Sequence, residues 1–236
     1  MMLVNEAESS GWTWGIRPYE KHKTSFRIQT MKLNLVLNGL FLAVILAFST
    51  GCQSTMQGSY SPSYLTTYAT IAPGTRVIIT GVSDRRNVKP ASYYYNPKNG
   101  DVGQFDKPVA DIVRTALGTE FERGRLVLSD VSHAKYTVNC EILEFKATLM
   151  ERLFQSSVLD MSVVLNFEWR DAATGALLAS NERSERRSQQ LPMGERPALP
   201  FNAGVIQSYG SELVNDMLPR VIEKELNLAP FLRPGQ

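Results

Sequence analysis

The alternating stretch at residues 159–170 limits the possible folds more than any other part of the chain. Six apolar residues stand there at every second position: Leu159, Met161, Val163, Leu165, Phe167 and Trp169. Strict alternation is typical of a strand in an antiparallel sheet with one buried face and one face in water. The sequence DAATG at 171–175 then predicts a hairpin turn. A second layer must therefore cover one face of this sheet.

Four further strands are predicted around this hairpin. The β-branched run RVIITGV at 76–82 gives the first strand, and residues 125–128 give a short second one. Residues 136–149 form a long third strand whose apolar phase flips after Ile142, which predicts a bulge or bend there. The strand returning from the hairpin, 176 to about 190, is polar in its second half, as an exposed or edge strand would be.

Two helices are predicted, one after the first strand and one near the C-terminus. The first has Asp106 as its expected N-cap, Pro108 in its first turn and Gly124 at its end. The second starts near Asn202, and Pro219 is expected to kink or split it. The predicted order is β-α-β-β-β-β-α. The fold class is α+β, with a two-layer, mostly antiparallel sheet of about five strands and two helices on one face.

The N-terminal part predicts a secretion signal. Met31 and Lys32 precede an apolar run at 33–48, which is followed by small residues and then by Gly51 and Cys52. This run of 16 residues is shorter than the roughly 20 residues that a membrane-spanning helix needs. The pattern resembles the lipobox of bacterial lipoproteins, except that Ser49 stands where that family usually has Leu. The alternatives are an ordinary signal peptide cut nearby or an uncleaved membrane anchor.

The lipobox predicts cleavage between Gly51 and Cys52, with Cys52 carrying the lipid. Residues 1–30 are interpreted as a start assigned too far upstream or as a long n-region, and 31–51 as the signal peptide. Residues 52–74 are rich in Ser, Thr, Tyr and Gly and predict a flexible tether. A single α+β domain at 75–228 and a tail at 229–236 complete the predicted organisation.

The charge of the chain excludes one class of partner. Residues 1–51 hold five Lys and Arg and three Asp and Glu, so the remainder keeps 25 − 5 = 20 basic and 23 − 3 = 20 acidic residues. A neutral mature protein gives no reason to expect nucleic-acid binding. With Cys52 acylated, Cys140 is the remaining thiol, and it is expected to be a small buried apolar residue that forms no disulfide within the chain.

No motif of a known catalytic, cofactor-binding or metal-binding site is found in the sequence. After residue 51 the chain has one histidine, His133, which is interpreted as a solvated loop residue. No metal-ligand spacing, GxGxxG motif or Walker loop is found. Glu120 and Glu122 lie on different faces of the predicted helix and are expected to add only solubility. We therefore expect no enzymatic activity and no cofactor.

Two groups of residues are candidates for recognition. Three adjacent tyrosines in the long loop at 84–104 are a possible partner interface, because tyrosine combines a large contact area with a hydroxyl: Tyr93, Tyr94 and Tyr95. The alternative is that one or two of them cover the end of the sheet. A mixed-charge group in the last strand predicts a solvated face or a site for phosphate or carboxylate groups: Arg183, Arg186 and Arg187, with Glu182 and Glu185.

The hairpin also carries a family resemblance. Residues 163–185 (VVLNFEWRDAATGALLASNERSE) resemble the central hairpin of the LPS-assembly lipoprotein (LptE) family, and AKYTVNCEILEF at 134–145 follows the same order. The likeness covers roughly residues 74–226. It implies a non-enzymatic partner of an outer-membrane β-barrel in lipopolysaccharide assembly. The YajG-like lipoproteins are also similar, through Asp84-Arg85 and the helix PVADIVRTALGTEF.

The expected function is that of an outer-membrane lipoprotein on the periplasmic face, acting as a binding or assembly module for an envelope protein or an envelope lipid. Gln53 favours the outer membrane, because it is not the Asp that resembles an inner-membrane retention signal. The alternatives are an accessory lipoprotein of an ABC-type lipid transport system, a YajG-like lipoprotein, a passive structural lipoprotein or an envelope hydrolase.

Overall fold

The computed structural model describes residues 53–63, 66–68, 71–72, 74–95, 102–130, 132–150, 158–190 and 203–234. The strands are β1 (Gln53–Met56), β2 (Arg76–Asp84), β3 (Tyr93–Tyr95), β4 (Val102–Phe105), β5 (Val127–Leu128), β6 (Tyr136–Met150), β7 (Val158–Asp171) and β8 (Leu177–Gln190). The helices are α2 (Val109–Arg123), α3 (Ala203–Glu212), the π-helical turn η1 (Leu213–Met217), α4 (Leu218–Leu228) and the short η2 (Pro230–Leu232). The fold class is α+β, as predicted.

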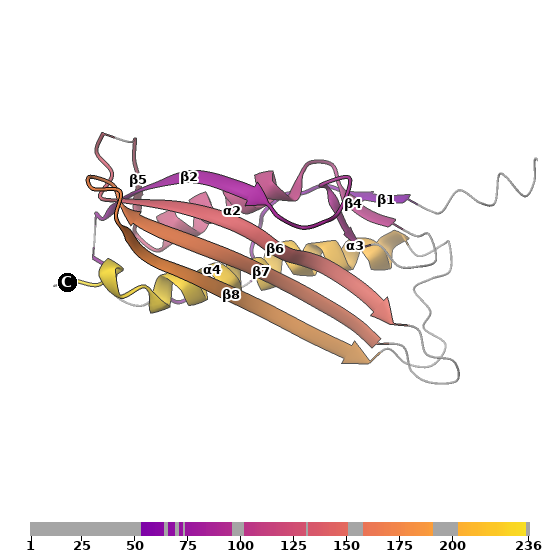
Figure 1. Ribbon diagram of the computed structural model, residues 1–236. Helices are drawn as coiled ribbons and strands as arrows, with labels where there is room; N and C mark the ends of the chain where they lie inside the picture. The colour runs from indigo at the N-terminus through magenta and orange to yellow at the C-terminus, as the bar shows by residue number, and fades with distance from the viewer. Residues whose placement is uncertain are drawn as a thin grey trace, which may run out of the picture. The chain divides into compact units, whose positions relative to one another are not determined.

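Three long strands dominate the sheet (Figure 1). β6, β7 and β8 form an antiparallel meander, and β7 pairs along its whole length with both neighbours. The other edge of β6 is shared, because β2 pairs in parallel with its first half and β3 with its second half. Beyond β3 lie β4 and then β1, while β5 pairs with β2. The short strands β1, β3 and β4 were not predicted, since each has only three or four residues.

The predicted irregularity in β6 is confirmed. The register of β6 against β7 shifts between Ile142 and Glu144. Before the shift Ile142 is buried, and after it Phe145 is buried in the same core. The extra residue therefore returns the apolar side chains to the covered face, as a β-bulge does.

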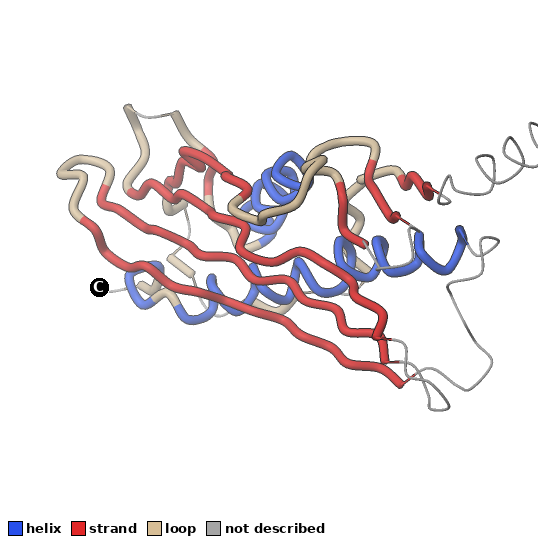
Figure 2. Tube along the Cα trace, turned by 45° about the vertical axis from the view of Figure 1, so that its right-hand side comes forward, coloured by secondary structure: helices blue, strands red, loops and turns tan. Residues whose placement is uncertain are grey.

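The helices cover one face of the sheet (Figure 2). Trp169 of β7 connects them, because its ring stacks on Phe121 of α2 at 5.8 Å and its indole N–H donates to Glu225 of α4. The C-terminal helix is not split at Pro219. It continues from α3 through η1 into α4. The irregularity expected at Pro219 is a π-helical turn, η1, which ends two residues before the proline.

The start of α2 differs from the prediction. The helix begins at Val109, and Pro108 occupies the cap position without a side-chain cap bond. Asp106 instead accepts a hydrogen bond from the Gly58 N–H at 2.8 Å. The carboxylate therefore binds the N-terminal segment of the chain rather than its own helix. Gly124 does end the helix, as predicted.

The strand register gives the domain two distinct ends. Ser54 pairs with Gly103, Gly103 with Tyr95, and Tyr95 with Ala147, so β1 begins level with the last residues of β6. We call this the near end; it also holds the start of β7 and the last residue of β8. The far end holds the turn at 171–175 and lies on the left of Figure 1, with the C-terminus.

The predicted tether and tail are parts of the domain wherever the structure describes them. The segment 53–74 contains β1, and Ile71 within it is buried. Ala72 donates its N–H to the Leu232 carbonyl, and Leu232 is itself buried. The polar composition of 53–74 suggested a free linker, but its polar groups bind the helices of the domain instead.

Candidate anchoring segment and sheet-face groove

Cys52, the predicted lipid attachment residue, and Gly51, the other side of the predicted cleavage point, lie outside the described residues. The structure describes the chain from the next residue, Gln53, which already belongs to β1 and pairs with Val102. No stretch of unpaired chain therefore separates residue 52 from the sheet. A lipid on Cys52 would be joined directly to the near end of the domain.

The anchoring segment, which we define as residues 53–68, is held on α2 by a buried carboxylate. Glu120 is fully buried, and its two oxygens accept hydrogen bonds from three hydroxyls of this segment. The Tyr60 hydroxyl lies at 2.6 Å, that of Thr66 at 2.9 Å, and Tyr68 is the third donor. Arg123 completes the set with an ion pair at 2.8 Å. Four donors thus satisfy a charge that burial would otherwise make costly.

The electrostatics of this cluster keep Glu120 ionised. Burial alone raises the pKa of the Glu120 carboxyl, but the hydrogen bonds from Tyr60, Tyr68, Arg123 and Thr66 together outweigh it and hold the pKa below its ordinary value. Burial and the same carboxylate raise the pKa of the Tyr60 hydroxyl well above its ordinary value. The tyrosines therefore remain donors and the glutamate an acceptor across the physiological range.

A second buried carboxylate fixes α4 to the sheet. Glu225 is fully buried and accepts hydrogen bonds from the Trp169 indole at 2.8 Å and the Asn181 amide at 3.1 Å. It also forms an ion pair with Arg183 at 2.8 Å. Burial dominates here and raises the pKa of Glu225 despite these three partners. The carboxylate therefore joins one helix to two strands.

The buried roles of Glu120 and Glu225 were not predicted from the sequence, although their spacing to apolar residues indicates that they lie on the covered face of each helix. Glu120 follows Ala116 by four residues and Leu117 by three, so it lies on the apolar face of α2. Glu225 stands in the same relation to Val221 in α4. A carboxylate at helical spacing within an apolar face indicates a buried, partnered group. The earlier expectation that Glu120 adds only solubility is wrong.

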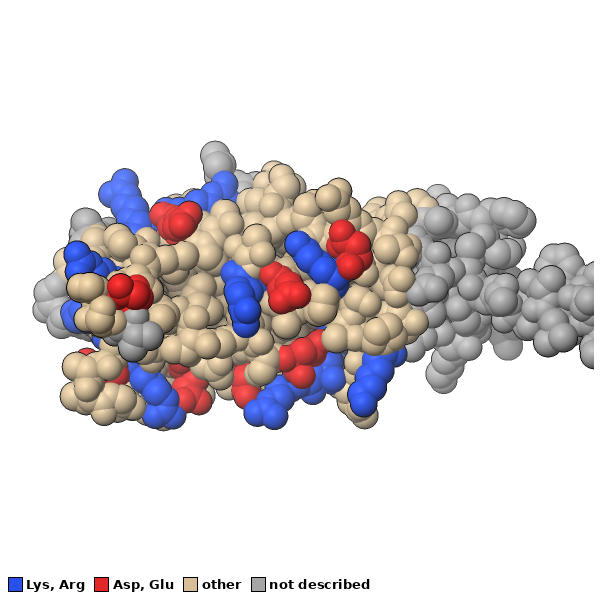
Figure 3. All heavy atoms as spheres, turned by 90° about the horizontal axis from the view of Figure 1, so that it is seen from above, with Lys and Arg blue, Asp and Glu red and all other residues tan. Residues whose placement is uncertain are grey.

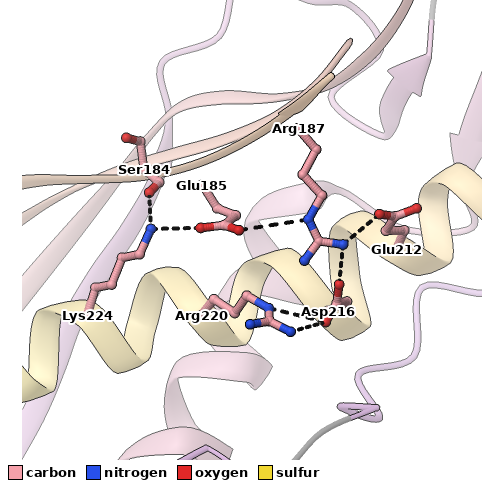
Figure 4. Close-up of polar contacts among 7 residues, drawn as sticks. All are labelled: Ser184, Glu185, Arg187, Glu212, Asp216, Arg220 and Lys224. Atoms are coloured by element: carbon pink, nitrogen blue, oxygen red, sulfur yellow. Dashed lines mark hydrogen bonds and ion pairs between the residues drawn. The ribbon is translucent and has the colours of Figure 1, made fainter. Parts of the chain in front are cut away.

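The arginines of β8 divide between the two faces of the strand. Arg183 reaches Glu225, and Arg187 pairs with Glu212 at 2.7 Å and also with Asp216. Figure 4 shows the Arg187 network, in which Glu185 also meets Lys224 at 2.7 Å. These contacts bind the edge strand to the helices. Of the three arginines considered for recognition, only Arg186 points to the solvent face, where 65% of its side chain is exposed.

The solvent face of the β6–β7–β8 meander carries a groove of about 470 Å³ at the near end. Two rows of facing residues across β6, β7 and β8 form its walls and floor: Lys146, Ser162 and Arg186 in one, and Thr148, Asp160 and Ser188 in the other. Glu144 borders the first row and lies 3.4 Å from Lys146 and 3.8 Å from Arg186. The neighbouring Ser162 hydroxyl, Lys146 and Arg186 hold the pKa of Glu144 below its ordinary value.

The tyrosine triplet is divided by the structure. Tyr94 is only 2% exposed, its ring packs on Phe105 at 4.4 Å, and its hydroxyl donates to the Ile206 carbonyl. The partner-interface prediction is therefore wrong for Tyr94, which is a core residue between sheet and helix. Tyr93 is half-buried, and its carbonyl accepts a hydrogen bond from Arg86. The side chain of Tyr95 lies outside the described residues.

His133 and Cys140 show no catalytic geometry. The Asp130 carboxylate and the Ser132 hydroxyl both contact the same ring nitrogen of His133, Nδ1, at 2.7 and 2.9 Å. A relay from serine to aspartate needs opposite nitrogens of the ring, so this trio cannot act as a triad. Cys140 is buried as predicted, and burial raises the pKa of its thiol to about 12. Such a thiol is not a nucleophile near neutral pH.

The described part of the chain has no group of three or more His, Cys, Asp or Glu that could hold a metal ion. Within the same residues, no helix is both long and apolar enough to cross a membrane.

Figure 3 shows Lys and Arg interspersed with Asp and Glu on the face seen from above. Neither sign of charge gathers there into a patch.

The solved structures to which the chain is similar are distant ones. No protein-family model and no curated protein matches the chain. Protein XCC0632 from Xanthomonas campestris, of the DUF330 family, has 12% identity and a TM-score of 0.45 over 74% of this chain and 94% of its own. CT253 from Chlamydia trachomatis has 11% identity and a TM-score of 0.40, covering 68% and 99%. A minor lipoprotein from Acinetobacter baumannii has 13% identity and a TM-score of 0.38, covering 69% and 96%. Likenesses at this level assign no function.

Proposed function

We propose that this protein is a lipid-anchored lipoprotein of the bacterial envelope that acts as a non-enzymatic binding module. The pattern at 31–52 supports the anchor. The observation that carries the proposal is that β1 begins at Gln53, directly after the lipid-bearing residue, and is paired into the sheet. An anchor joined to a sheet without a spacer holds the near end of the domain at the lipid headgroups.

The far end would then face away from the membrane. β7 has 14 residues, which at about 3.3 Å per residue span roughly 45 Å. Most large apolar side chains that are exposed in the described residues lie at this end: Val127, Leu128, Leu177, Leu178 and Leu228. Exposed apolar side chains at one end of a domain favour contact with a protein. We therefore assign partner binding to the far end.

The finer form of the proposal is an outer-membrane lipoprotein that is a partner of a β-barrel in lipopolysaccharide assembly. Gln53 after the lipidated cysteine supports the outer membrane. The resemblance of residues 163–185 to the LPS-assembly lipoproteins supports the barrel partner, and their turn forms the far end. An accessory role in ABC-type lipid transport is the alternative.

Metabolic labelling with an alkyne fatty acid tests the anchor. Wild-type protein should carry the label, and Cys52→Ser should not. A Cys140→Ser variant, which removes the buried thiol, should be labelled like the wild type. Label that persists in Cys52→Ser would contradict the lipid assignment.

Photo-crosslinking in intact cells tests the binding role. A crosslinking amino acid at Leu177, at the far end, should capture an outer-membrane barrel protein, and the same probe at Glu144, on the solvent face of the meander, should not. Capture of a transport ATPase complex would instead support the ABC alternative. Lack of any stoichiometric protein adduct at Leu177 and Leu128 would contradict a binding module.

A further inference from the structure

The sheet-face groove holds polar groups whose contacts within the protein are long or poorly aligned. Ser162 is 6% exposed, and its hydroxyl forms no hydrogen bond of normal geometry with any described residue. A buried hydroxyl without a partner is uncommon in folded proteins and requires an explanation. It lies at the floor of the groove between Lys146 and Arg186, which face it from β6 and β8. A ligand oxygen in this position would satisfy it.

The charges around Ser162 are weakly engaged within the protein. Arg186 has Glu144 as its ion-pair partner among the described residues, at the long distance of 3.8 Å. Asp160, in the adjacent row, forms no ion pair with any described residue. Glu144 is shared between Lys146 at 3.4 Å and Arg186. Two cations therefore flank the hydroxyl, and a carboxylate borders them on each side.

We propose that this groove binds the phosphoethanolamine headgroup of a phospholipid. The phosphate would lie over Ser162 between Lys146 and Arg186, since Arg and Lys are the usual phosphate ligands and the hydroxyl adds a third donor. The ammonium of the headgroup would pair with Glu144 or Asp160. A zwitterionic headgroup fits better than an anionic one, because Glu144 and Asp160 lie beside Lys146 and Arg186, and the third lining cation, Arg187, is already paired with Glu212 and Asp216.

The position of the groove supports a lipid as the source of this headgroup. Asp160 lies two residues from Val158, where β7 begins at the near end. Under the proposed anchoring, this end stands at the membrane surface. The volume of about 470 Å³ lies within the range of small-molecule sites. The proposal thus rests on the proposed function for its lipid source, while its chemistry depends on the groove alone.

The test is calorimetric titration of the lipidated full-length mature protein in detergent micelles with dihexanoyl-phosphatidylethanolamine and, separately, dihexanoyl-phosphatidylglycerol. Saturable binding with a preference for the ethanolamine lipid is expected. Arg186→Gln should weaken it about tenfold, the usual effect of losing a charge-assisted hydrogen bond. Ser162→Ala should weaken it severalfold without lowering the melting temperature. Arg170→Gln, on the same face of β7 at the far end, should leave it unchanged.

Three results would overturn the proposal: no saturable binding of either lipid, equal binding of both lipids, or wild-type affinity in Arg186→Gln. A double variant Glu144→Gln, Asp160→Asn should abolish the preference for the ethanolamine lipid, and a retained preference would also count against it. This test separates failure of the lipid anchor from failure of the groove proposal. Cys52→Ser, which takes no fatty acid, should still bind the short-chain lipid.

Discussion

The Ser63 N–H donates a hydrogen bond to the main-chain carbonyl of Asn215 at 2.8 Å. In a regular helix this carbonyl would accept from the residue four positions later, but that residue is Pro219, which has no N–H. The anchoring segment thus occupies an acceptor that the proline leaves open. The Asn215 side chain adds a second contact by accepting from the Ser61 N–H at 2.8 Å. A helix-breaking residue here creates a docking position for a distant part of the chain.

Replacing the proline should release this contact. In Pro219→Ala, the new N–H can bond to the Asn215 carbonyl and compete with Ser63. We expect amide hydrogen exchange at Ser63 to accelerate about fivefold, which corresponds to losing roughly 1 kcal/mol of one hydrogen bond. Exchange in the β6–β7 ladder, for example at Val163, should not change. Unaltered protection of Ser63 would show that it does not depend on the proline.

Glu120→Gln should destabilise the domain and change its response to acid. The variant loses the negative charge that four donors satisfy, and we expect the free energy of unfolding at pH 7 to fall by about 2 kcal/mol. The pKa of Glu120 is lower in the folded than in the unfolded chain. Its stabilisation is therefore complete above the ordinary value of 4.5 and is lost as the pH falls through the lower folded pKa.

Urea unfolding between pH 3 and pH 7 measures both effects. The wild type should lose stability more steeply than Glu120→Gln as the pH drops below 4.5, so the two curves should converge. Glu122→Gln, an exposed neighbour on the same helix, serves as the matched control and should follow the wild type. Curves that stay parallel would contradict an ionised Glu120 in the folded state.

Glu225→Gln should behave in the opposite sense. The pKa of Glu225 is raised in the folded state, so the folded chain takes up a proton before the unfolded chain does. This group therefore adds stability as the pH falls through its folded pKa, and the variant should lack that gain. The amide can still accept from Trp169 and Asn181, so we expect a change below about 1 kcal/mol at pH 7.

Fluorescence of Trp169 reports on this prediction directly, because the chain from residue 52 onward has no other tryptophan. Unfolding curves at pH 4.5 and pH 7 should separate for the wild type and coincide more closely for the variant, because the gain is complete at the ordinary pKa of 4.5. Asn181→Ala is a useful companion, since it removes one donor and leaves the charge in place. If Glu225→Gln lost more free energy of unfolding at pH 7 than Glu120→Gln, the prediction that Glu120 contributes more stability than Glu225 would be wrong.

Two glycines of α3 should respond in opposite directions to alanine. A Cβ on Gly210 would lie 2.7 Å from the Tyr94 ring and 2.8 Å from Met56, so Gly210→Ala should cost about 1–3 kcal/mol through overpacking. A Cβ on Gly204 would meet nothing within 4 Å, so Gly204→Ala should raise stability slightly through helix propensity. Thermal unfolding of both variants measures the difference, and equal effects would contradict the close approach of α3 to Tyr94.

The central meander and the helices that cover it are predictable from the amino-acid sequence. Strict alternation at 159–170 placed Trp169 and its apolar partners inside, and the phase change at Ile142 located the bulge of β6. These features are local, because the two-residue period of a strand and the 3.6-residue period of a helix are visible along the chain itself. The hairpin turn and the end of α2 at Gly124 were readable for the same reason.

The buried carboxylate clusters depend on contacts between distant parts of the chain and are not predictable from the sequence. Nothing in the polar segment 53–68 indicated that its hydroxyls would meet Glu120, because partners 52 to 60 residues apart leave no periodic trace. The same holds for Glu225, whose partners Trp169, Asn181 and Arg183 lie on two strands far from it in the sequence. Both carboxylates are fully buried. Burying a charge is tolerated only where donors converge on it, and the convergence depends on which elements pack together.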